Sequence, residues 1–121
     1  MEACGCLMRH GAHQGLGRMR DHRLNEIRTL VARGQYQLSE HVFAAIELGE
    51  FDERDIETCI MTGVIRQREK DELGVAADRY KYAILGHSCC GAPFEVVGKF
   101  ISVGANKEVF IITAYHREGY K

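Results

Sequence analysis

The spacing of the apolar residues changes at Gly63, and this change constrains the fold more than any other feature of the sequence. Before Gly63, apolar residues recur every three or four positions, which is the period of a helix with one buried face; after it they alternate, which is the period of a strand. We therefore expect an α+β domain with three N-terminal helices followed by a four-stranded antiparallel sheet.

Capping residues and glycines divide the first half into three helices. The expected ranges are 21–33, 39–48 and 52–62, with Asp21, Ser39 and Asp52 as N-caps. Gly34, Gly49 and Gly63 follow the three helix ends. The residues expected to face the core are Leu24, Ile27, Leu30 and Val31, then Val42, Phe43 and Ile46, and finally Ile56, Cys59 and Ile60.

Four alternating segments in the second half predict strands at 64–69, 80–86, 94–102 and 108–115. The segments between them are short and rich in turn residues, which favours antiparallel neighbours with the helices on one face. In the last strand, alternation places Tyr115 on the same face as Val109 and Ile111. Both of its faces are largely apolar, so we expect this strand to be central.

Length and composition indicate one domain at 21–121, preceded by a flexible arm at 1–20 that contains four glycines. No apolar run has the length of a membrane span or of a secretory signal, so we expect a cytoplasmic protein without membrane contact. The net charge is −1, with 16 Lys and Arg against 17 Asp and Glu. Any contact with RNA therefore requires a local basic patch.

Four ordered segments carry a resemblance to a known family: YQLSEHVFAAI, GEFDERDIETCIMTGVI, YKYAILG and PFEVVGKFISVGANKEVFIITAY. Over residues 24–117 the chain resembles a bacterial family of unknown function that is similar in fold to the RelE-like and BrnT-like toxins. The resemblance implies a RelE-like architecture and a ribonuclease toxin that needs no metal or other cofactor. It also implies RNA as the target and a small antitoxin protein as the partner.

Cleavage of this kind uses the 2′-hydroxyl of RNA as the nucleophile, together with a base, an acid and cations that stabilise the developing charge. The candidate catalytic residues are Lys99, Tyr115, His41 and His116, and the candidate substrate-binding residues are Arg79 and Arg117. The sequence departs from the family pattern at Glu95, where relatives carry a histidine before the Val-Val pair. Relatives also carry arginines in the second helix, where this chain reads VFAAI.

Each candidate also has a structural interpretation. His41 lies in a first helical turn and can bond to the cap, and Lys99 can reach past the sheet edge to solvent. The Tyr115 ring can be buried with its hydroxyl bonded, and His116 and Arg117 can belong to a solvated tail. The alternative function is a non-catalytic interaction domain that dimerises through an exposed edge strand.

Several cysteines and histidines raise the question of a metal. Cys4, Cys6, His10 and His13 have zinc-ligand chemistry, but they lack the spacing of two separated ligand pairs, so no metal site is predicted. We interpret Cys89 and Cys90 as reduced thiols in a turn. No phosphate-binding glycine loop, carboxylate pair or nucleophile elbow supports another enzyme class.

Overall fold

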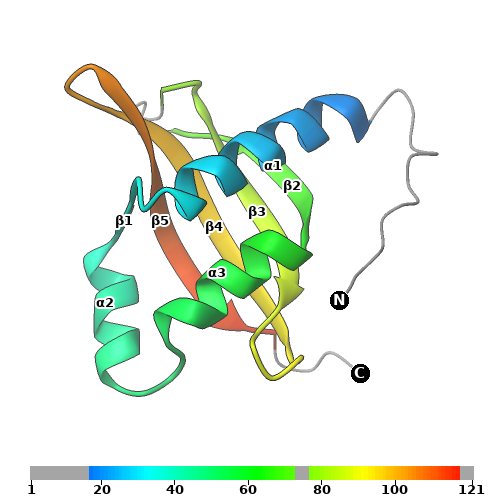
Figure 1. Cartoon of the computed structure of the whole chain (residues 1–121), viewed down its shortest axis with the longest axis vertical. Helices are drawn as coiled ribbons and strands as arrows, with labels where there is room; N and C mark the ends of the chain where they lie inside the picture. Colours follow the sequence, from blue (N-terminus) through cyan, green and yellow to red (C-terminus); the bar gives the residue numbers. More distant parts are fainter. Residues whose placement is uncertain (1–16, 73–76, 118–121) are drawn as a thin grey trace.

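The computed structural model describes residues 17–72 and 77–117. In this part of the chain an α+β fold is formed by three helices and a five-stranded mixed sheet with the strand order β1-β5-β4-β3-β2 (Figure 1). The elements are α1 (Gly17–Ala32), β1 (Tyr36–Leu38), α2 (Glu40–Glu47), α3 (Glu53–Thr62), β2 (Val64–Lys70), β3 (Tyr80–His87), β4 (Pro93–Val103) and β5 (Asn106–His116).

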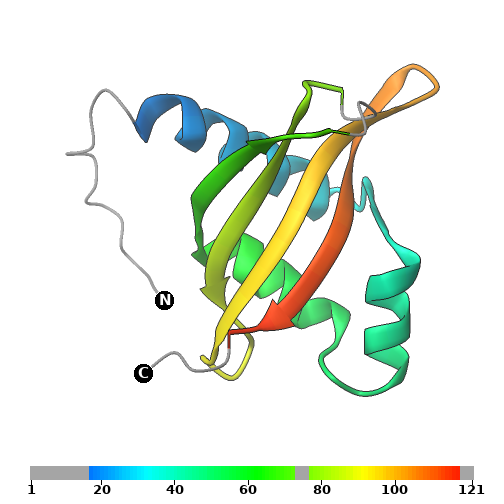
Figure 2. The ribbon, with the colours of Figure 1, turned by 180° about the vertical axis from the view of Figure 1, so that it is seen from behind.

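The helices cover one face of the sheet and leave the other uncovered. In Figure 1, α1 and α3 cross in front of the strands, while α2 lies beyond the β5 edge. Figure 2 shows the reverse side, where no described helix crosses strands β2 to β5. We call this second side the open face of the sheet.

The prediction of a four-stranded, all-antiparallel sheet is wrong in one element, because it lacks the short strand β1. Its residues Tyr36–Leu38 pair in parallel with Val109–Ile111 of β5. A three-residue strand is too short to show alternation, and its partner is more than 70 positions away, so no local pattern marks it. Because β1 lies between α1 and α2, the helices do not all precede the sheet.

The expected helix ends match the observed ones, except at the start of α1. Ser39 is the N-cap of α2 and accepts from the Val42 N–H, and Asp52 forms a capping box with Asp55 at the start of α3. The first helix begins at Gly17 rather than at Asp21, so it takes four residues from the expected arm. The remainder of that arm lies outside the described residues.

The core lies between the helices and the covered face of the sheet. The predicted inward residues of α1 and α3 are all buried. Of the predicted inward residues of α2, Val42 is buried and Ile46 is partly buried, whereas Phe43 has 55% of its surface exposed. The reason is the position of α2 at the sheet edge, where only a narrow stripe around Val42 is covered.

A β-bulge in β5 overturns the predicted alternation of that strand. Thr113 lies opposite Val97, but Ile111 lies opposite the next residue, Gly98, so Ile112 is an extra residue in β5. Val109, Ile111 and Ala114 therefore contribute to the core, whereas Tyr115 lies on the open face. The prediction assumed unbroken alternation, and one inserted residue exchanges the two faces.

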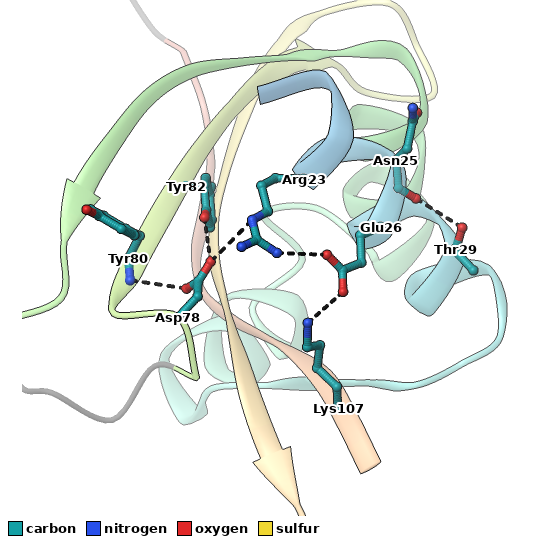
Figure 3. Close-up of polar contacts among 8 residues, drawn as sticks. All are labelled: Arg23, Asn25, Glu26, Thr29, Asp78, Tyr80, Tyr82 and Lys107. Carbon is teal, nitrogen blue, oxygen red and sulfur yellow. Dashed lines mark hydrogen bonds and ion pairs between the residues drawn. The ribbon is translucent and has the colours of Figure 1, made fainter. Parts of the chain in front are cut away.

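A chain of charged groups fixes α1 to the sheet (Figure 3). The Arg23 and Lys107 side chains both donate to Glu26, at 3.0 and 2.6 Å, and Arg23 lies 3.7 Å from Asp78. Asp78 in turn accepts a 2.5 Å hydrogen bond from the Tyr82 hydroxyl. Burial opposes ionisation of Glu26, but its bonds from Lys107 and Arg23 outweigh this and lower its pKa.

No helix in the described part of the chain has the length and apolar character that a membrane span requires.

Candidate functional site

The open face has a shallow hollow of about 260 Å³ near its centre. Side chains from four strands surround it, so it lies across the sheet rather than at an edge. The lining residues are Arg66, Gln67, Glu69, Lys81, Ala83, Glu95, Val97, Ile112 and Thr113.

Glu95, on the central strand β4, is the most unusual residue of this hollow. Its side chain is only 2% exposed, although no described helix covers this face. Its Oε2 accepts from Arg66 Nη2 at 2.9 Å, and its Oε1 accepts from Arg117 Nη1. Tyr115 lies directly opposite Glu95 in the β4–β5 register. We call Glu95 and its two partners, Arg66 and Arg117, the Arg66–Glu95–Arg117 cluster.

The two arginines keep Glu95 ionised. Burial alone would raise the pKa of the carboxyl group, but the hydrogen bonds from Arg66 and Arg117 outweigh that effect and hold the pKa below its usual value. A nearly buried carboxylate is stable only with such partners, because an unpaired buried charge is very costly. The Glu95 carboxylate is therefore ionised and paired with both arginines at neutral pH.

The two guanidinium groups are only partly covered. The Arg66 and Arg117 side chains are 39% and 32% exposed. A guanidinium has five N–H donors, and the bonds to Glu95, with one from Arg66 Nη1 to Gln67, use only some of them. Further donors of both arginines therefore lie at a surface that a ligand can reach.

The structure gives Lys99 a partner that the sequence did not reveal. Lys99 Nζ lies 3.2 Å from Asp71 Oδ2, and the two side chains are only 7% and 4% exposed. Lys99 is also four residues from Glu95 along β4, which corresponds to about 13 Å. The charge of Lys99 is thus balanced by Asp71, and Lys99 does not line the hollow around Glu95. A catalytic role for Lys99 stays a prediction.

The other candidates are scattered. Arg79 directly precedes β3, at the end of the sheet far from Glu95, in a left-handed conformation with φ +74°. His116 lies on the covered side of the sheet, where its ring packs edge-on against the Phe94 ring with the two ring centroids 5.0 Å apart. His41 lines a separate hollow together with Tyr115. Of the six predicted site residues, only Tyr115 and Arg117 adjoin Glu95.

Sequence reasoning missed the central role of Glu95 and the contribution of Arg66. The signal for Glu95 was its position in an apolar strand, since a carboxylate there must be paired with a cation. Nothing comparable marked Arg66, because a bulge between Ile65 and Gln67 shifts the register of β2 at this point. The face on which Arg66 lies could therefore not be read from alternation.

The described cysteines do not form a metal site. Cys89 and Cys90 are exposed free thiols, and the Cys89 N–H donates to Asp55 at 3.0 Å. Cys59 is a buried residue of α3, and this burial raises the pKa of its thiol to about 12. Within residues 17–72 and 77–117, no group of three or more His, Cys, Asp or Glu side chains could hold a metal ion. Cys4, Cys6, His10 and His13 lie outside these ranges.

Comparison of the chain with protein-family models, with curated protein sequences and with solved structures gave no significant match. The resemblance to the RelE-like toxins stays a prediction.

Proposed function

We propose that the chain is a toxin-type ribonuclease that binds and cleaves RNA on the open face of its sheet without a metal. The observation that carries this proposal is the Arg66–Glu95–Arg117 cluster in the central hollow, with Tyr115 opposite Glu95. A carboxylate, two guanidiniums and a phenol supply the base, the phosphate ligands and the acid that cleavage by a 2′-hydroxyl requires.

In this proposal the RNA phosphate competes with Glu95 for the two guanidiniums. Planar guanidiniums bind phosphate oxygens in pairs, as they bind carboxylates. When an arginine turns to the phosphate, a Glu95 oxygen is released and the pKa of the carboxyl group rises, because a neighbouring cation has moved away. Glu95 then becomes a better base than it is in the free protein.

The chemical step follows from these positions. Glu95 accepts the proton of the 2′-hydroxyl, and the oxygen attacks the adjacent phosphorus. Arg66 and Arg117 stabilise the charge that develops on the phosphoryl oxygens. The Tyr115 hydroxyl donates its proton to the leaving 5′-oxygen, so that the products are a 2′,3′-cyclic phosphate and a free 5′-hydroxyl. An antitoxin partner would block this reaction by covering the hollow.

Controlled expression in a bacterium tests the proposal. Wild-type protein is expected to arrest growth and to degrade total RNA, whereas Tyr115→Phe and Arg66→Lys variants are expected to be harmless. Arg54→Lys provides a matched control that should keep full toxicity, because Arg54 is an exposed arginine of α3 and does not line the hollow. Harmless expression of soluble, folded wild-type protein would contradict the proposal.

The second candidate function is a non-catalytic interaction domain. It is favoured by the neutralisation of cations on the open face: Lys99 is paired with Asp71, and Arg66 and Arg117 share Glu95. These pairs leave little net positive charge for binding RNA. Harmless expression in the experiment above, with folded protein confirmed, would support this second candidate.

A further inference from the structure

The β5 strand has an uncovered edge beyond the end of β1. The pairing of β1 with β5 stops at Ile111, after which the Ser39 N–H donates to Ile111 O at 3.0 Å and Ser39 Oγ to Ile112 O at 2.8 Å. The chain then enters α2 and leaves the sheet. Within the described part of the chain, no strand pairs with residues 113–116 on this side.

Backbone donors point toward that edge. The Arg117 N–H donates to Pro93 O on the β4 side, at 3.1 Å. N–H groups alternate between the two sides of a strand, so those of Ala114 and His116 face away from β4. An uncovered row of such groups is a template for an added strand.

A hollow of about 360 Å³ lies between this edge and α2. Ala44 and Ala45 line it with small side chains, and Tyr115 contributes from β5. Leu48, which also lines it, is 76% exposed, the largest value among the large apolar side chains that the structure describes. We call this hollow and the adjoining edge at residues 113–116 the α2–β5 groove.

The rim of the α2–β5 groove is acidic. Glu50 lines the hollow. Glu40 and Glu47 are exposed and lie beside Ala44 on the helix surface, since residues three or four apart are neighbours. His41 also lines the hollow. A segment that binds here must supply positive charge to match three carboxylates.

We propose that the α2–β5 groove is a docking site for an extended, basic segment of a partner protein. The segment adds a strand beside residues 113–116, where its carbonyls accept from the Ala114 and His116 N–H groups. An apolar side chain of the segment fills the hollow against Leu48. A basic side chain pairs with Glu50 at the rim. This site adjoins the hollow around Glu95, because Thr113 lines both hollows and Tyr115 lies opposite Glu95. Its occupation does not depend on the proposed ribonuclease activity.

Fluorescence anisotropy with a labelled, capped peptide Lys-Val-Lys-Val-Arg-Leu tests the site in the full chain, and Glu-Val-Glu-Val-Glu-Leu is the comparison peptide. The basic peptide is expected to bind saturably and the acidic one not to bind. Glu50→Lys should weaken binding of the basic peptide about fivefold, because an exposed ion pair becomes a repulsion. Glu72→Lys, which makes the same charge change at an exposed site between β2 and β3, should leave binding unchanged.

Backbone hydrogen exchange measured by NMR locates the bound peptide. The Ala114 and His116 amides should exchange more slowly once the basic peptide is added. The proposal is overturned if binding is not saturable, if Glu50→Lys and Glu72→Lys weaken it equally, or if protection appears around Arg66 instead. It is also overturned if these amides are already protected in a dimer without peptide, since a second copy would then occupy the groove.

Discussion

Replacing Glu95 by glutamine tests whether the buried carboxylate holds the open face together. Glutamine keeps the shape of the side chain but removes the charge, which leaves the two arginines facing each other. Removing one member of a buried ion pair costs about 3 to 5 kcal/mol. Because the Arg66 and Arg117 side chains are 39% and 32% exposed, water screens part of their repulsion, and we expect the lower end, about 3 kcal/mol.

Urea unfolding at pH 7 measures this cost. If the free energy of unfolding falls by about 1.5 kcal/mol per molar urea, the urea concentration at the unfolding midpoint should be roughly 2 M lower for Glu95→Gln than for the wild type. Glu69→Gln is the matched control, because Glu69 is an exposed carboxylate on the rim of the same hollow. That change should stay within about 0.5 kcal/mol of wild type. A Glu95→Gln cost below about 1 kcal/mol would refute the assignment of Glu95 as the charge that holds both arginines.

The difference in stability between the wild type and the Glu95→Gln variant is expected to depend on pH. The folded-state pKa of Glu95 is lowered, so the carboxylate stabilises the fold fully above its unfolded pKa of about 4.3. This contribution is lost as the pH falls from there through the lowered pKa. The stability difference between wild type and Glu95→Gln should therefore shrink below about pH 4. A difference that stays constant down to pH 2 would contradict this assignment.

Three further perturbations test other parts of the structure. Lys99→Met and Asp71→Leu should each lower the free energy of unfolding by about 3 kcal/mol, and the double variant should regain most of this loss. Additive losses in the double variant would argue against a buried pair. Arg79→Gly should raise the free energy of unfolding in urea by about 0.5 to 1 kcal/mol, because φ +74° is strained for arginine; a lower free energy of unfolding would contradict this. Gly86→Ala should cost about 3 kcal/mol in thermal unfolding, because its Cβ would lie 2.5 Å from Cys59 O, and a neutral result would mean that α3 can shift.

Most of the fold could be predicted because its determinants are local. The change of period at Gly63, the caps at Ser39 and Asp52 and the alternation in β2 to β5 are each read from a few neighbouring residues. β1 could not be predicted in this way, because its three residues become a strand only by pairing with Val109–Ile111. The extra residue at Ile112 could not be predicted either, and it moved Tyr115 to the open face.

The candidate site was less predictable, because it depends on which charges meet across strands. Sequence reasoning selected Lys99 as a catalytic candidate but did not identify its partner, because Asp71 is 28 residues away. Glu95 was identified only as a departure from the family pattern. Its two arginines come from a bulged edge strand and from the residue after β5, and no sequence period links these three positions.

Purified protein incubated with a short labelled RNA in the presence of EDTA shows whether the Arg66–Glu95–Arg117 cluster cleaves RNA. We expect cleavage to a 2′,3′-cyclic phosphate, no cleavage where a single 2′-deoxy nucleotide replaces the attacked position, and loss of activity in folded Tyr115→Phe protein. Intact RNA after incubation with folded wild-type protein, or equal cleavage at the 2′-deoxy position, would contradict this expectation.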